Sequence, residues 1–284
     1  MIGAGPVATT LAGALRLAGV PVLGLWARKP ERARAAGAVA GVASFSAAPP
    51  DLLLEADAVI TAVRDDAITD VADMLVSSGF VASKHVLIHC SGAMSAGQAF
   101  GAVTKQVRGV ATLHPLRAIA DAREAIEDLA GTVFGIEGDE AGRSVARDLV
   151  RAMRGRPLEL AETQMAAYHA AAAMVSNYVV ALIDSAAQLL EQGGIERKEA
   201  LGALLPLARG AVANVEERGV DQGLTGPIRR GDTETIAKHL AALKELPPEL
   251  QTVYRVLGSQ TVSIARRVQD ATVSDLDAIQ ALLD

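Results

Sequence analysis

The sequence predicts an α/β protein with a mainly parallel sheet in its first half and an all-α domain in its second. Its 284 residues correspond to about two domains of roughly 150 residues each. Up to about residue 160, short apolar runs alternate with Ala-rich helical stretches, which is the pattern of a parallel α/β sheet. After Ala161 the β pattern stops and long helical patterns follow. We therefore expect one domain over residues 1–161 and a second over residues 162–284.

Short segments of the first half have the composition of strands. Most are apolar without alternation, which is typical of strands that helices cover on both faces. They are Met1–Ile2, Pro21–Trp26, Ala58–Val63, His85–His89, Val110–His114, Thr132–Ile136 and Pro157–Leu160. Since a strand normally has about five residues, we expect the first of them to begin before Met1.

Long helices are predicted for the second half. They are Glu162–Gln192, Glu196–Arg218, Thr233–Leu243, Pro247–Val268 and Ser274–Leu283. Glycine and proline mark the joints, as in Gly193-Gly194, the loop Gly219–Asp232 and Pro247-Pro248. Because no low-complexity linker separates the halves, we expect them to pack directly on each other.

Composition and charge exclude several classes of partner. A net charge of -6, a pI near 5.5 and 3% aromatic residues argue against a nucleic-acid partner. The single cysteine, Cys90, cannot form an intrachain disulfide or a structural zinc site with several thiolates, so we expect no metal and a cytoplasmic location. The apolar stretch Ala166–Leu190 contains polar residues, and we expect a buried helix of a soluble protein there, not a membrane span.

A glycine-rich motif, G-x-G-x-x-A, follows the first strand. Gly3 permits a tight turn, Gly5 permits close approach of the backbone to a pyrophosphate, and Ala8 permits close packing of helix on strand. The helix that begins at Pro6 and Val7 would offer free N–H groups to phosphates. The motif predicts a Rossmann-type dinucleotide site, and the alternative is an ordinary glycine turn.

The end of the second strand bears on the choice of cofactor. An NAD enzyme usually carries Asp or Glu there for the ribose 2′-hydroxyl. This chain has Arg28 and Lys29 instead, with Arg32 soon after. Their charges suit a 2′-phosphate, so we expect NADP. The alternative is a solvated basic turn before a helix.

Two further strand ends are expected over the dinucleotide. Val63-Arg64 and Ser91 follow predicted strands, and ligands bind at the carboxyl ends of parallel strands. Asp65 would more simply cap the next helix. A nucleophilic Cys90 would need an activating base and an electropositive site, and we expect no such role for it.

Three segments together resemble a known family. They are the glycine loop, His114-Pro115-Leu116 after a strand, and the stretch from Leu224 to Asp232. They look like an uncharacterised bacterial family of Rossmann-like NADP-binding proteins with a C-terminal helical domain of unknown function. That family is similar in plan to pyrroline-5-carboxylate reductase and ketopantoate reductase, and more distantly to prephenate dehydrogenase and 6-phosphogluconate dehydrogenase. The resemblance implies a Rossmann-type domain, a helical domain like the C-terminal one of 6-phosphogluconate dehydrogenase that commonly dimerises, and an active cleft between them.

The first long helix carries candidate catalytic residues. His169 and Ser176 are seven residues apart, within roughly 20° on one helix face, and Asn177 flanks that face. Asn177 matches an Asn of ketopantoate reductase-like enzymes, whereas their Lys, four residues earlier, is Ala173 here. His169 could replace that Lys as a proton donor. The alternative is a packing role for His169.

Two other places are candidates for the substrate site. His114 precedes Pro115 at a strand end, where it either serves catalysis or belongs to a fixed turn. The loop with Thr225, Arg229 and Arg230 offers guanidinium groups suited to a carboxylate or phosphate. Its alternative role is a capped helix joint with solvated arginines.

These residues predict an NADPH-dependent reductase of a small carboxylated ketone or imine. A non-catalytic NADP-binding or regulatory protein is the opposing hypothesis, and a deazaflavin-linked NADP reductase is a third. Ala-rich helices bury little area each, so we expect a homodimer through the helical domain. His85 and His239 are expected at the surface.

Overall fold

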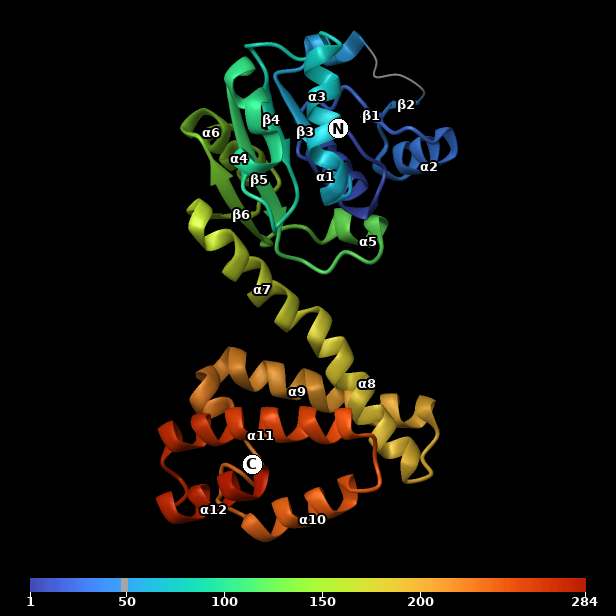
Figure 1. Cartoon of the computed structure of the whole chain (residues 1–284). Helices are drawn as coiled ribbons and strands as arrows, with labels where there is room; N and C mark the ends of the chain where they lie inside the picture. The colour runs from blue at the N-terminus through green and yellow to red at the C-terminus, as the bar shows by residue number, and fades with distance from the viewer. Residues whose placement is uncertain (47–50) are drawn as a thin grey trace. The chain divides into compact units, whose positions relative to one another are not determined.

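The computed structural model describes residues 1–46 and 51–284, and it divides into two compact units (Figure 1). The first unit is Met1–Ser176 and the second is Asn177–Asp284. A mainly parallel sheet lies in the first unit, and the second is built from helices, so the predicted fold class is confirmed. The domain boundary predicted after residue 161 falls inside the first unit of this division.

The sheet of the first unit is parallel except at one place. Its strands are β1 (Leu25–Trp26), β2 (Ser44–Phe45), β3 (Ala58–Thr61), β4 (Val86–His89), β5 (Gly109–Pro115), β6 (Val133–Gly138) and β7 (Arg156–Glu159). Ile2 bridges Trp26 and Thr61 and so joins the pair β2-β1 to the run β3-β4-β5-β6-β7. Only β5 and β6, among the described strands, pair antiparallel. The carboxyl ends of β1, β3, β4 and β5 consequently share one edge, where predicted site residues lie.

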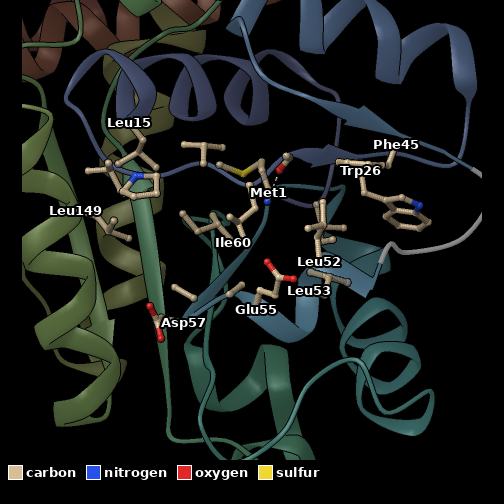
Figure 2. Close-up of a pocket in the computed structure, with 18 of the residues that line it drawn as sticks. Met1, Leu15, Trp26, Phe45, Leu52, Leu53, Glu55, Asp57, Ile60 and Leu149 are labelled. Atoms are coloured by element: carbon tan, nitrogen blue, oxygen red, sulfur yellow. Dashed lines mark hydrogen bonds between the residues drawn. The ribbon is translucent and has the colours of Figure 1, made fainter.

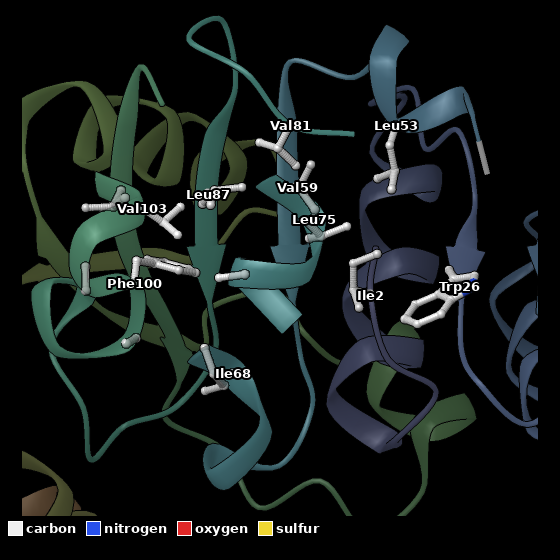
Figure 3. Packing of buried hydrophobic residues seen from close by; sticks show 14 residues of the cluster. Ile2, Trp26, Leu53, Val59, Ile68, Leu75, Val81, Leu87, Phe100 and Val103 are labelled. Atoms are coloured by element: carbon white, nitrogen blue, oxygen red, sulfur yellow. The ribbon is translucent and has the colours of Figure 1, made fainter. Parts of the chain in front are cut away.

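Apolar side chains of the central strands alternate between two cores. Val59 and Leu87 face one core (Figure 3), whereas Ile60 and Ile88 face the other. Helices close both sides, because α3 and α4 contribute to the first core and α1 and α6 to the second. The helices of this unit are α1 (Pro6–Leu17), α2 (Pro30–Ala40), α3 (Ile68–Ser77), α4 (Ala96–Phe100), α5 (Ala122–Glu127), α6 (Glu140–Ala152) and α7 (Met165–Val175), with 3₁₀ turns at Asp51–Glu55, Asp65–Ala67, Gly101–Gln106 and Glu162–Gln164. Coverage on both faces explains why these strands lack a polar face.

The second unit has its own core. Its helices are α8 (Asn177–Gln192), α9 (Arg197–Gly223), α10 (Thr233–Leu243), α11 (Pro248–Val268) and α12 (Val273–Leu283). Buried aliphatic side chains such as Ile236, Val262 and Ile279 come from three of these helices. The bounds of α10 agree with the sequence prediction. A left-handed residue, Gly219 with φ +74°, interrupts α9 near its end, where the predicted loop begins.

Several sequence predictions need correction. His85 is buried, not at the surface, since its ring bonds to backbone atoms of Leu53 and Ala82. The long helix predicted from Glu162 is divided at Ser176, which separates α7 from α8. That segment, 162–192, is long and apolar enough to cross a membrane by length and composition, and few of its residues are buried, contrary to the expected buried helix.

Candidate active site

The glycine loop has the geometry that its sequence predicts. Gly3 has φ +120°, and a Cβ there would lie 2.2 Å from the carbonyl oxygen of Ala62, so only glycine fits. Gly5 precedes α1, no side chain caps that helix, and a Cβ at Gly5 would meet no atom within 4 Å. Ala8 is fully buried against the strand. The first turn of α1 therefore has no side-chain cap and begins beside the open space at Gly5; Pro6 lacks an N–H, so Val7 and Ala8 carry the first N–H groups of the helix, and this arrangement suits a pyrophosphate.

Basic residues follow β1 on the same edge of the sheet. Arg28, Lys29 and Arg32 are all exposed, and none forms an ion pair with another described residue. The side chain that ends β1 is Trp26, so no carboxylate stands at this strand end. The three cations are available for an anionic group, which agrees with a 2′-phosphate better than with a 2′-hydroxyl.

The ends of β3 and β4 meet beside the glycine loop. Ser91 donates its hydroxyl proton to Asp65 over 2.9 Å, so Asp65 orients Ser91 and does not cap a helix. Arg64, next to the half-buried Val63, forms an exposed ion pair with Asp66. Burial raises the pKa of the Cys90 thiol to about 12, which agrees with the expectation that Cys90 is no nucleophile.

Two predicted residues from distant parts of the chain lie together at Gly92. His114 comes from β5 and His169 from α7, and their ring centroids are 5.9 Å apart. A Cβ at Gly92 would lie 2.7 Å from Nδ1 of His169 and 2.9 Å from Nε2 of His114. Nδ1 of His169 and the Cε1–Nε2 edge of His114 thus both lie against Gly92, and a side chain at this position would displace at least one of the rings.

The environment of His114 keeps its imidazole neutral. The pKa of His114 is lowered to about 4, mainly by burial and secondly by a charge on His169, while Asp65 partly offsets both effects. The hydroxyl of Tyr168 lies 2.8 Å from Nδ1 of His114, and the two rings stack edge-to-face. At neutral pH, His114 is therefore a hydrogen-bonding group and not a cation.

A network of buried polar side chains lies next to this edge of the sheet. The backbone N–H of Ser91 donates to Nδ1 of His89 over 3.2 Å, and Nε2 of His89 lies 2.9 Å from the hydroxyl of Thr112. The carboxylate of Glu137 accepts from Ala96 N–H over 2.7 Å. Burial lowers the pKa of His89 to about 4. The network ties β4, β5 and β6 together and fixes the turn that carries Gly92.

Sequence analysis missed Tyr168 and His89 as parts of the site. Tyr168 had one local signal, since it directly precedes His169. His89 ends an apolar strand, and the polar partner of its ring lies on a neighbouring strand. Such a partnership depends on strand pairing and leaves no local mark in the sequence.

Other predicted residues lie at or beyond the end of the first unit. Ser176 ends α7 and donates its hydroxyl proton to the carbonyl of Ala172 over 2.9 Å. Asn177 begins α8 and belongs to the second unit, as does the exposed Thr225. The roles predicted for Ser176, Asn177 and Thr225 stay predictions.

The arginine loop of the second unit is tightly hydrogen-bonded. The guanidinium of Arg229 donates to Asp270 over 2.6 Å and to the carbonyl of Leu224 over 2.6 Å. Asp232 caps α10 by accepting from Thr235 N–H, as expected. Arg230 is exposed. Arg229 therefore serves the loop itself, and the substrate roles predicted for Arg229 and Arg230 stay predictions.

An apolar cavity lies in the first unit (Figure 2). It has a volume of about 340 Å³ and a mainly apolar lining that includes Leu15, Ile60 and Leu149, with the carboxylates of Glu55 and Asp57. Asp57 directly precedes β3, so the cavity is at the amino end of that strand. None of the predicted site residues lines it.

Comparison with known families and structures agrees with this geometry. Residues 132–261 match the family model of DUF2520, a domain of unknown function. The match begins at the start of β6 and ends inside α11, so it includes α7 with His169. It bears out the expected resemblance to an uncharacterised family with a C-terminal domain of unknown function. No curated protein matches the chain.

Solved structures share the whole fold. A protein of Thermotoga maritima is 26% identical, with 94% of this chain and 96% of that chain covered and a TM-score of 0.69. A candidate NADP oxidoreductase of Bacteroides fragilis is 22% identical, with 95% and 96% covered and a TM-score of 0.68. Pyrroline carboxylate reductase of Plasmodium falciparum, solved with NADP bound, is 14% identical, with 100% and 97% covered and a TM-score of 0.56. At these identities the likeness establishes the fold.

Proposed function

We propose that this protein is an NADPH-dependent reductase of a small carboxylated ketone or imine. The observation that carries the proposal is the convergence of two imidazole nitrogens on Gly92, at the sheet edge that also carries the glycine loop. Structures with this fold include an imine reductase and several pyrroline carboxylate reductases, which supports the reaction class. Ligands of such sheets bind outside the carboxyl ends of the strands.

The residues present fit a dinucleotide phosphate. The loop from Gly3 to Ala8 would hold the pyrophosphate, and Arg28 with Lys29 would hold the 2′-phosphate. Val63, Arg64 and Ser91, at the ends of β3 and β4, would line the remaining part of the cofactor. When bound, NADPH supplies a hydride.

The imidazoles would act on the substrate atom that gains the proton. A carbonyl oxygen or imine nitrogen develops negative charge as its carbon accepts the hydride. His114, neutral and held by Tyr168, would donate a hydrogen bond to that atom, and His169 would provide the proton. We propose Ser176, Asn177, Thr225, Arg229 and Arg230 as further substrate contacts, because their side chains carry hydrogen-bond donors; the donors of Ser176 and Arg229 would exchange their present partners for the substrate.

Cofactor binding is tested by titration with NADPH and NADH, followed by nucleotide fluorescence. We expect tighter binding of NADPH and, in Arg28→Ala, a loss of that preference by about tenfold or more, since charge-assisted hydrogen bonds contribute most to phosphate recognition. The matched control is Arg108→Ala, because Arg108 is exposed and directly precedes β5, at the opposite sheet edge. Equal affinity for both nucleotides in the wild type would contradict the NADP assignment.

Turnover is tested with a panel of 2-oxo acids and cyclic imines while NADPH absorbance is followed. Oxidation of NADPH with at least one panel member is expected, and it should fall in His169→Gln. NADPH binding without turnover of any panel member would favour the opposing hypothesis, a non-catalytic NADP-binding protein.

We also propose that the protein forms a homodimer through its second unit. Exposed apolar side chains gather on α8 and α9, among them Val180, Leu207 and Val212. Solvent exposure of such surface is unfavourable by about 25 cal/mol per Å². Light scattering at micromolar concentration should give twice the mass of the chain, and a monomeric mass would contradict the proposal.

A further inference from the structure

Tyr168 contacts the imidazole nitrogen of His114 that faces away from Gly92. Its hydroxyl oxygen lies 2.8 Å from Nδ1 of His114, while the Cε1–Nε2 edge of the same ring lies against Gly92. The phenol ring packs on Gly135, which lies opposite His114 in the β5–β6 ladder. A Cβ at Gly135 would lie 2.7 Å from the hydroxyl oxygen of Tyr168, so the backbone leaves just enough room for this ring.

The hydrogen-bond distances favour Tyr168 as the donor to His114. The hydroxyl of Tyr168 has one proton and two acceptors within reach, Nδ1 of His114 at 2.8 Å and the carbonyl oxygen of His114 at 3.5 Å. Hydrogen bonds from hydroxyl groups are normally 2.5 to about 3.0 Å long, which favours Nδ1 over the carbonyl oxygen as the acceptor of this proton. Burial raises the pKa of Tyr168, which keeps the phenol protonated at neutral pH. A neutral imidazole that accepts at Nδ1 carries its own proton on Nε2.

We propose that Tyr168 is a positioning residue that holds His114 in the Nε2–H tautomer and aims this N–H at the substrate position beside Gly92. The inference rests on the proposed reductase function and assigns different roles to the two imidazoles. His114 polarises the carbonyl or imine as a neutral donor and keeps its proton. His169 transfers a proton.

The balance of the step follows from these roles. With NADPH bound as the hydride source, the substrate carbon would gain the hydride, and the electron pair of the C=O or C=N bond would move to oxygen or nitrogen. That atom takes the proton of the His169 imidazolium, and the neutral His169 regains a proton from solvent. The hydrogen bond from His114 shortens as the negative charge develops, which is where preorganised donors contribute most.

The groups around His114 are consistent with different roles for the two imidazoles. Its ring faces Tyr168 and His169 on α7, Gly92 after β4, and the charge of Asp65 after β3. A proton on His169 disfavours a second proton on His114, because the like charges repel across a short distance. A charge on His169 thus favours the neutral form of His114, in agreement with the role of neutral donor proposed for His114.

The second unit contains a matched pair for comparison. Nδ1 of His239 lies 2.8 Å from the hydroxyl of Tyr254, and these rings also stack edge-to-face at 87°. His239 is exposed on α10, and Tyr254 is on α11. Tyr254→Phe therefore removes the same contact without touching the candidate site.

Nitrogen-15 NMR of the full-length protein tests the proposal directly. Long-range proton–nitrogen correlations of labelled histidines report which ring nitrogen carries the proton, and His114→Gln assigns the signals of His114. We expect one tautomer, with Nε2 protonated, in the wild type and in Tyr254→Phe. In Tyr168→Phe the two nitrogen shifts of His114 should move toward each other, as in a tautomer mixture.

A second variant guards against a general loss of structure. Gly135→Ala keeps the hydroxyl of Tyr168 but displaces it from His114, so it should produce the same tautomer mixture. Thermal unfolding must show that each variant is folded. An unchanged Nε2–H tautomer in both folded variants, or an Nδ1–H tautomer in the wild type, would overturn the proposal.

The NMR measurement tests the role of Tyr168 independently of the proposed reductase function. The tautomer is measured without cofactor or substrate, so a failed NADPH titration would remove the reductase and leave the role of Tyr168 standing. Where turnover is found, Tyr168→Phe should lower kcat by about tenfold with little change in the KM for NADPH. Unchanged kcat together with an unchanged tautomer would remove Tyr168 from the site.

Discussion

Two histidine–tyrosine pairs of this chain have the same contact and different surroundings. His114 with Tyr168 and His239 with Tyr254 both show a 2.8 Å distance from Nδ1 to the hydroxyl and an interplanar angle of 87°. Only the first pair, among the described residues, has another imidazole within ring contact, that of His169. The hydrogen bond alone therefore does not make a site, and the convergence of further groups does.

The difference arises from how each pair is held. Burial lowers the pKa of His114 to about 4, and the ring lies between a strand end and α7. His239 is exposed on α10, and its tyrosine partner comes from a second helix, α11. A sheet edge brings several loops to one point, whereas two antiparallel helices share only a line of contact.

The largest effect is expected from a change at His169, the imidazole that lies beside the pair of His114 and Tyr168. His169→Gln removes the proton donor and should lower turnover by about 100-fold or more, in the range usual for general acid catalysis. His239→Gln, the matched change in the other unit, should leave turnover unchanged. Steady-state rates of NADPH oxidation measure both. Equal rates in the two variants would show that the cluster has no catalytic part.

A change at Gly92 tests the convergence itself. In Gly92→Ala the new Cβ would lie within 3 Å of both imidazoles, so the rings must separate. Turnover should fall by about 100-fold, as displacements near 1 Å commonly cause. The control is Gly210→Ala, where a Cβ meets no atom within 4 Å. If Gly92→Ala retained full activity, the two nitrogens would not act together.

We expect the free energy of unfolding to fall at acidic pH because of His114, the buried histidine of the two pairs. The pKa of His114 is about 4 in the folded chain and about 6.5 when unfolded, so the unfolded state binds protons first as the pH falls. Stability is then full above about pH 6.5 and is lost toward pH 4. His89, with the same direction of shift, contributes as well. Thermal midpoints should fall less steeply with pH in His114→Gln than in the wild type or His239→Gln.

The smallest effect is expected at the exposed pair. Tyr254→Phe removes one hydrogen bond at a half-buried position, which should lower the free energy of unfolding by less than about 1 kcal/mol. Urea denaturation measures the change. A loss well above this value would mean that the second pair is a structural anchor of α10 and α11.

Much of the site follows from sequence because its signals are local. The glycine loop, the basic turn at Arg28 and the positions of His114 and His169 each depend on a few neighbouring residues and a strand end. The buried state of His85 and the roles of His89 and Tyr168 were not predictable in this way. Most of their partners are backbone or side-chain atoms of distant segments, which only the tertiary fold brings together.

The secondary-structure predictions also succeed where the sequence signal is local and fail where it is not. The bounds of α10 follow from Asp232 as its cap and from helical periodicity, and the prediction agrees with the structure. The strand β2 was missed, because two residues pairing with β1 leave no pattern in sequence. The break at Ser176 also has no glycine or proline to mark it.

The break between α7 and α8 bears on how sequences with this fold can diverge. Because α7 belongs to the first unit, Gly92, His114, Tyr168 and His169 form their cluster within one unit, and the chain passes to the second unit only after Ser176. Mutations that reshape α8 to α12 leave these four residues in place. Substitutions can thus accumulate in the second unit while the four-residue cluster of the first unit is inherited unchanged.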